Sequence, residues 1–104
     1  MDSRKIASKL EKRNGKDCLI FLFNTEELVI NLNSDDQESL KNLFYKMMHE
    51  LFNGLFEIEK PTEEYEPKLF ADIANDYIDK LNKELKQIWE NLPSELKQAE
   101  NRGH

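Results

Sequence analysis

The sequence predicts a small α+β domain with the element order α-β-β-α-(β)-α, in which a short β-hairpin packs on two long amphipathic helices. Two apolar runs, over 18–23 and 28–32, are separated by a polar turn, as in a hairpin. Two later segments, over 35–53 and 67–91, repeat apolar residues at helical spacing. A chain of 104 residues has room for one core. We therefore expect a single domain over 1–93 and a short polar tail over 94–104.

The first element is expected to be a short helix over residues 4–13. Ser3 can cap its N-terminus. Asn14 and Gly15, which tolerate the left-handed conformation of a helix end, would stop it. Helical spacing would place its apolar residues on one side: Ile6, Ala7 and Leu10.

The hairpin is expected to be covered on both faces. The run from Cys18 to Phe23 is apolar at every position, whereas a strand with one wet face alternates polar and apolar residues. The returning strand runs from Leu28 to Leu32 after a polar turn at 24–27.

The helix over 35–53 has a clear N-terminal signal, because Ser34 and Gln37 are spaced as in a capping box. Gly54 follows its end. Beyond it, Phe56 and Ile58 alternate with glutamates, which predicts a short third strand over 55–59.

The helix over 67–91 begins at Pro67, which suits a first helical turn, and ends before Pro93. Its apolar residues span an arc of roughly 200°, wider than one packing layer needs. We expect the middle of the arc to be core: Phe70, Ile73, Tyr77 and Leu81. We expect the margin to be partly available to a partner, with tryptophan as the anchor: Ile78, Leu85 and Trp89.

Charge is unevenly distributed along the chain. Residues 1–17 hold six basic and three acidic residues, although the whole chain has a net charge of −6. The basic residues of the expected first helix could contact nucleic-acid phosphates, or could pair with the acidic body of the same chain or of a partner: Arg4, Lys5, Lys9 and Lys12. We favour the pairing interpretation, because net negative charge discourages nucleic-acid binding.

No residue pattern indicates catalysis, a metal or a cofactor. His49-Glu50 resembles the start of a zinc-protease helix, but Asn53 stands where the second histidine is needed. Cys18 is the single cysteine in an apolar run, which is typical of a small buried residue. The three glycines form no phosphate-binding loop. We expect neither an enzyme nor a small-molecule substrate.

The chain has no apolar run of membrane-spanning length and no signal-peptide core, so we expect a cytoplasmic protein without membrane contact. The wide apolar stripes favour a protein–protein interaction module that acts as an accessory subunit, an inhibitor or an antitoxin-like regulator. Its docking surfaces would be the long C-terminal helix and the hairpin edge, and its partner another protein or a second copy.

Two alternatives stay open. One is an acidic inhibitor of mobile-element or phage type that mimics nucleic acid, which requires the glutamates of 57–66 to join Asp72, Asp76 and Asp79 in one continuous face. The other is a weak nucleic-acid binder that uses the basic residues of the expected first helix.

Overall fold

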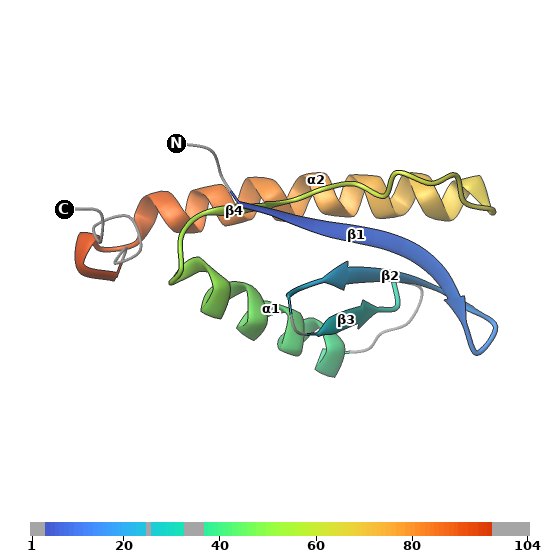
Figure 1. Ribbon diagram of the computed structural model, residues 1–104, viewed down its shortest axis with the longest axis horizontal. Helices are drawn as coiled ribbons and strands as arrows, with labels where there is room; N and C mark the ends of the chain where they lie inside the picture. The colour runs from blue at the N-terminus through green and yellow to red at the C-terminus, as the bar shows by residue number, and fades with distance from the viewer. Residues whose placement is uncertain (1–3, 25, 33–36, 97–104) are drawn as a thin grey trace.

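The computed structural model describes residues 4–24, 26–32 and 37–96, and within this part of the chain the fold is α+β. A four-stranded mixed sheet has the order β3-β2-β1-β4. β1 pairs antiparallel with β2 and parallel with β4, and β2 pairs antiparallel with β3. The elements follow the chain in this sequence (Figure 1): β1 (Arg4–Arg13), β2 (Lys16–Leu22), β3 (Glu27–Ile30), α1 (Gln37–Leu51), β4 (Phe56–Ile58), α2 (Lys68–Asn91) and the 3-10 turn η1 (Ser94–Leu96).

The expected first helix is wrong, because residues 4–13 form strand β1. Asn14 and Gly15 have positive φ angles of 53° and 76° and close a tight hairpin between β1 and β2. The four-residue spacing of Ile6 and Leu10 fits one side of a helix and one face of a strand equally well. Only pairing with β2, from Ala7 opposite Leu22 to Arg13 opposite Lys16, distinguishes the two.

The other elements lie close to their predicted places. The short strand β4 is confirmed, and α2 begins at Lys68, one residue after its predicted start. α1 ends at Leu51 rather than at Asn53, and with 15 residues it is much shorter than α2, with 24. The predicted capping residue Ser34 and the tail over 97–104 lie outside the described residues.

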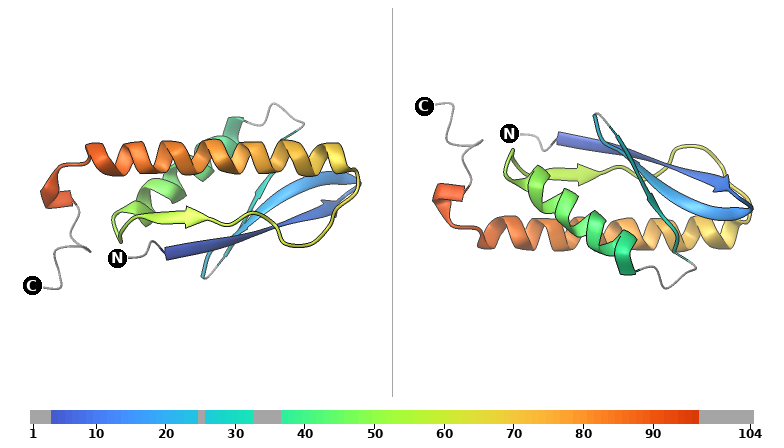
Figure 2. Two further views of the ribbon diagram at one scale, coloured as in Figure 1. Left: turned by 90° about the horizontal axis from the view of Figure 1, so that it is seen from above. Right: turned by 90° about the horizontal axis from the view of Figure 1, so that it is seen from below.

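Both helices cover the same face of the sheet, giving two layers around one core (Figures 1 and 2). α1 contributes Leu43, Met47 and Leu51 to this core. The strands, together with Phe23 directly after β2, supply aromatic and branched residues: Ile6, Leu19, Phe21, Ile30, Phe56 and Ile58. The opposite face of the sheet carries no helix in the described part of the chain.

The buried side of α2 is only partly the one predicted, because Phe70 and Leu81 are buried as expected and Tyr77 is half-buried. Ile73 is 43% exposed, although we expected it in the core. The three residues expected at an accessible margin are all buried within this chain: Ile78, Leu85 and Trp89. They belong to one stripe with spacings of three and four residues: Phe70, Ala74, Ile78, Leu81, Leu85 and Trp89. The apolar arc is wider than one layer covers, so its sequence does not decide which part faces the sheet.

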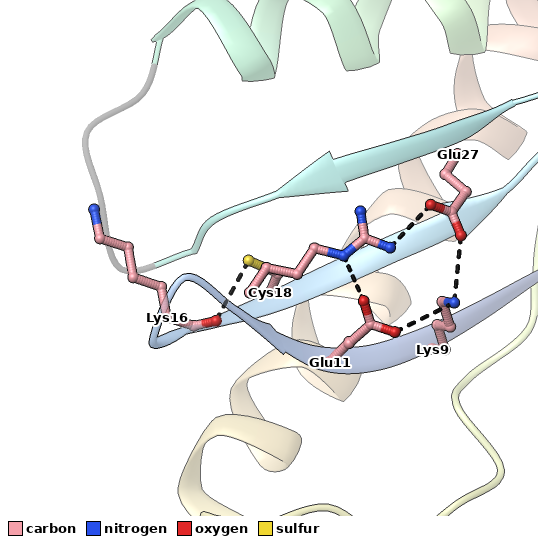
Figure 3. Close-up of polar contacts among 6 residues, drawn as sticks. Lys9, Glu11, Lys16, Cys18 and Glu27 are labelled. Carbon is pink, nitrogen blue, oxygen red and sulfur yellow. Dashed lines mark hydrogen bonds and ion pairs between the residues drawn. The ribbon is translucent and has the colours of Figure 1, made fainter.

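The helix-free face of the sheet is covered by charged side chains. Ile20 points to this face and is 0% exposed, with Lys9 and Val29 as its neighbours on the adjacent strands. Lys9, Glu11, Arg13 and Glu27 form an ion-paired network that joins β1 to β3 across this face (Figure 3). Long charged side chains shield apolar surface with their aliphatic stems. The prediction that β2 is buried on both faces is thus confirmed, without a second helical layer.

The free edge of β4 is closed by a side chain of α2. The amide of Asn82 accepts a hydrogen bond from the Ile58 N–H (2.8 Å) and donates one to the Ile58 carbonyl (2.9 Å). A single side chain therefore reproduces the two bonds that a further strand would make. This contact fixes both the position and the rotation of α2 beside the sheet.

Replacing Asn82 with alanine is expected to lower the free energy of unfolding by about 2–3 kcal/mol, because both main-chain groups of Ile58 lose their partner. Denaturant unfolding monitored by circular dichroism measures this. Asn75→Ala, in the same helix, is the matched control and should change stability by less than about 0.5 kcal/mol. Equal effects of the two substitutions would contradict the role assigned to Asn82.

Candidate protein-binding surfaces

An apolar groove runs between α1 and α2 on the side of the helices away from the sheet. Its volume is about 190 Å³. Phe44 is 54% exposed and Leu40 is 39% exposed, and both line it. The remaining lining is mostly apolar: Leu43, Met47, Met48, Tyr77, Leu81, Glu84, Leu85 and Ile88. We call this surface the α1–α2 groove.

The groove arises because α1 carries more apolar residues than its contact with the sheet uses. Leu43 and Met47 point into the core, whereas Phe44 lies to one side of their stripe and stays outside. Leu40 lies on the stripe itself but in the first turn of α1, where it remains 39% exposed. The sequence suggested surplus apolar surface but assigned it to α2. Of the three residues expected to bind a partner, Leu85 lines this groove as part of its buried floor, while Ile78 and Trp89 do not line it.

The four basic residues considered for nucleic-acid contact are all paired with carboxylates of the same chain. Arg4 donates to the Glu50 carboxylate (3.0 Å) and to two main-chain carbonyls, those of Glu50 and Gly54. The other ion pairs are Lys5 with Glu57 (3.1 Å), Lys9 with Glu11 and Glu27 (3.4 and 3.3 Å) and Lys12 with Asp17 (3.8 Å). Arg4, Lys5 and Lys9 thus pair with the acidic body of the same chain, as expected. The partner of Lys12, Asp17, belongs to the basic region of residues 1–17 itself.

The strand geometry also separates these four cations. Successive side chains of a strand point to opposite faces, so Lys5 and Lys9 lie on one face of β1 while Arg4 and Lys12 lie on the other. They do not form the single basic surface that a helix would have given.

The network on the helix-free face lowers the pKa of its two carboxyl groups and raises the pKa of its two basic groups. Hydrogen bonds from Arg13 and Lys9 lower the pKa of the Glu27 carboxyl, and the bond to Glu27 is the main cause of the raised pKa of Lys9. These side chains are well exposed to solvent, so the ion pairs themselves stabilise the fold only weakly. Their main contribution is to cover Ile20 and Cys18.

The histidine and cysteine weighed as chemical candidates lie apart. Cys18 is buried in β2, and its Sγ donates a weak hydrogen bond to the Lys16 carbonyl at 3.6 Å (Figure 3). His49 is exposed on α1. Among the described residues, no three His, Cys, Asp or Glu side chains are grouped to hold a metal ion. None of the described helices is long and apolar enough to cross a membrane.

The acidic segment after β4 is held along α2 by contacts at both ends. Lys60 pairs with Asp79 (3.0 Å), and the rings of Tyr65 and Phe70 lie 5.9 Å apart. The Tyr65 hydroxyl donates to the Asp17 carboxylate (2.7 Å), which ties the segment to β2. Six of the surrounding carboxylates have no ion-pair partner within the described part of the chain: Glu59, Glu63, Glu64, Glu66, Asp72 and Asp76.

Tyr65 should make stability depend on alkaline pH. Burial, together with the hydrogen bond to Asp17, raises the pKa of its hydroxyl from 10.0 to about 12. The folded state therefore favours the protonated hydroxyl, and its stabilising effect is complete below pH 10 and is lost as the pH rises toward 12.

Unfolding by denaturant at a series of pH values, compared with the same series for Tyr65→Phe, measures this effect. The difference in stability between the two proteins should shrink between pH 10 and pH 12. A difference that stays constant over that range would show that the Tyr65 hydroxyl does not prefer its protonated form in the fold.

Similarity to known proteins gives no further guide to these surfaces. Comparisons with protein-family models, with curated proteins and with solved structures find no match.

Proposed function

We propose that this chain is a non-catalytic protein-binding module that docks its partner in the α1–α2 groove, and so acts as an accessory subunit, an inhibitor or a regulator. The observation that carries the proposal is the exposure of Phe44 and Leu40 beside a formed apolar groove. Covering a large apolar side chain is worth roughly 1.5–3 kcal/mol, so a partner that covers both gains substantially.

The shape of the groove favours a helix as the occupant. Two neighbouring helices form a trough that accepts an amphipathic helix with anchors at three- and four-residue spacing. α1 itself carries such a ridge, since Leu40, Phe44 and Met48 follow one another at four-residue spacing. A second copy of the chain can therefore supply the ridge and offer the groove at once, as two-fold symmetry requires.

The hairpin edge supports docking less well than the groove. β3 is the edge strand of the sheet, and its Glu27 side chain is held by Arg13 and Lys9. Charged residues on an edge strand discourage strand pairing between chains. We therefore place the principal contact on the helices.

The acidic inhibitor of nucleic-acid-binding proteins is the second candidate. The acidic segment lies along α2, and six carboxylates around it are unpaired within the described residues, which favours this function. Ion pairs with Lys5 and Lys60 neutralise Glu57 and Asp79, members of the required acidic series. A series interrupted in this way imitates a phosphate backbone less well than an unbroken one, so we rank this function second. The pairing of all four basic residues of β1 argues against direct nucleic-acid binding.

Phe44→Asp is expected to abolish association while leaving the fold intact, because Phe44 is more than half exposed and its loss leaves no cavity. Sedimentation at high micromolar concentration should give twice 12.4 kDa for the native chain and 12.4 kDa for the variant, with little change in melting temperature. Leu69→Asp is the matched control, since Leu69 is also exposed but lies outside the groove.

A native chain that stays at 12.4 kDa would exclude a second copy as the occupant. Dissociation by Leu69→Asp as well as by Phe44→Asp would contradict docking in the groove.

A further inference from the structure

Strand β1 is longer than the strand that pairs with its outer edge. β4 pairs only with Arg4, Lys5 and Ile6, whereas β1 continues to Arg13. The Arg4 N–H donates to the Leu55 carbonyl, and the Ile6 carbonyl accepts from the Glu59 N–H, so even-numbered residues of β1 direct their main-chain groups toward this edge. The N–H and C=O groups of successive residues in a strand point alternately to its two edges. The N–H and C=O groups of Ser8, Leu10 and Lys12 therefore point the same way.

These main-chain groups have no strand beside them. In the described part of the chain, no main-chain hydrogen bond joins Ser8, Leu10 or Lys12 to the segment that follows β4. That segment leaves the line of β4 after Glu59, and Pro61 could not donate to a strand because it has no N–H. The edge of β1 is thus unpaired at the place where β4 would have continued.

The segment after β4 curves away from β1 before it reaches α2 (Figure 2). A cavity of about 430 Å³ lies between this edge and the segment. Residues 7–11 of β1 form one wall and residues 61–65 the other, and Leu22 also lines it. The segment is fixed at both ends, where the Ser8 hydroxyl donates to the Glu59 carbonyl and the Tyr65 hydroxyl donates to Asp17. The space is therefore a formed slot, which we call the β1 edge slot.

The charges around the β1 edge slot are predominantly negative. Glu63 and Glu64 line its outer wall, are exposed and have no ion-pair partner among the described residues. Lys9 is the basic residue in the lining, and it is already paired with Glu11 and Glu27. An occupant that supplies positive charge would satisfy the free carboxylates.

We propose that the β1 edge slot binds an extended, basic polypeptide segment of a partner protein as an added strand. Its main chain would pair with Ser8, Leu10 and Lys12, as in β-strand addition, and its basic side chains would meet Glu63 and Glu64. The net charge of −6 disfavours a second copy of this chain in an acidic slot. The slot lies on the edge of the sheet and does not share lining residues with the α1–α2 groove, so this proposal is independent of the proposed function.

The test uses the full chain and a capped heptapeptide of alternating lysine and valine. Amide hydrogen exchange followed by NMR should show that saturating peptide slows exchange of the Leu10 and Lys12 amides by about tenfold or more, since these amides gain partners. The same peptide N-methylated at alternate residues keeps its charge but cannot pair as a strand, and it should give no protection. Binding of both peptides with equal affinity, or protection that excludes Leu10 and Lys12, would overturn the proposal.

Charge reversal tests the acidic wall. Glu64→Lys should weaken binding of the unmethylated peptide about fivefold or more, because an attraction becomes a repulsion. Glu90→Lys makes the same change in net charge on an exposed position of α2 outside the slot, and it should weaken binding far less. Equal weakening by the two variants would mean that only net charge attracts the peptide. If the Leu10 amide became protected from exchange as the protein concentration rose, without any peptide, the edge would instead pair with a second copy of the chain. Equal weakening by the two variants and protection without peptide would each refute the proposal.

Discussion

The paired hydrogen bonds between the Asn82 amide and the main chain of Ile58 hold α2 at the free edge of β4. Because one side chain makes both bonds, α2 can neither rotate nor slide without breaking them. The helix consequently turns Ile78, Leu85 and Trp89 inward and leaves Leu69 and Ile73 in solvent. The α1–α2 groove lies beside this anchored helix, which contributes Tyr77, Leu81 and Leu85 to its lining.

The ion pairs of strand β1 determine where unpaired charge remains in the chain. The cations of β1 pair with carboxylates from β2, β3, β4 and α1, so the basic N-terminal region is neutralised within the chain. Among the described residues, unpaired negative charge is concentrated in the segment after β4, at Glu59, Glu63, Glu64 and Glu66, whereas α2 carries four lysines against five acidic residues. This leaves an apolar surface between the helices and an acidic surface at the edge of β1. The two surfaces differ in chemistry and suit different partners.

Sequence patterns predicted part of each candidate site. The surplus of apolar residues was visible in the wide stripes of both helices, but the exposed members lie on α1, at Leu40 and Phe44, rather than at Trp89. The acidic segment was visible as a run of glutamates. The β1 edge slot was not visible, because an unpaired strand edge depends on where the neighbouring strand stops. No signal within residues 4–13 indicates that β4 pairs with three of them.

By itself, the sequence determined the α+β class, the hairpin, the short strand at Phe56–Ile58 and the extent of α2, because apolar periodicity and proline placement act locally. Tertiary structure alone decided three things. Residues 4–13 became a strand because Ile6 and Leu10 satisfy both periods and β2 offers main-chain partners. The buried arc of α2 was chosen by the contact of Asn82 with Ile58. The open edge of β1 arose because the chain turns away after Glu59, and such long-range pairing has no local signature.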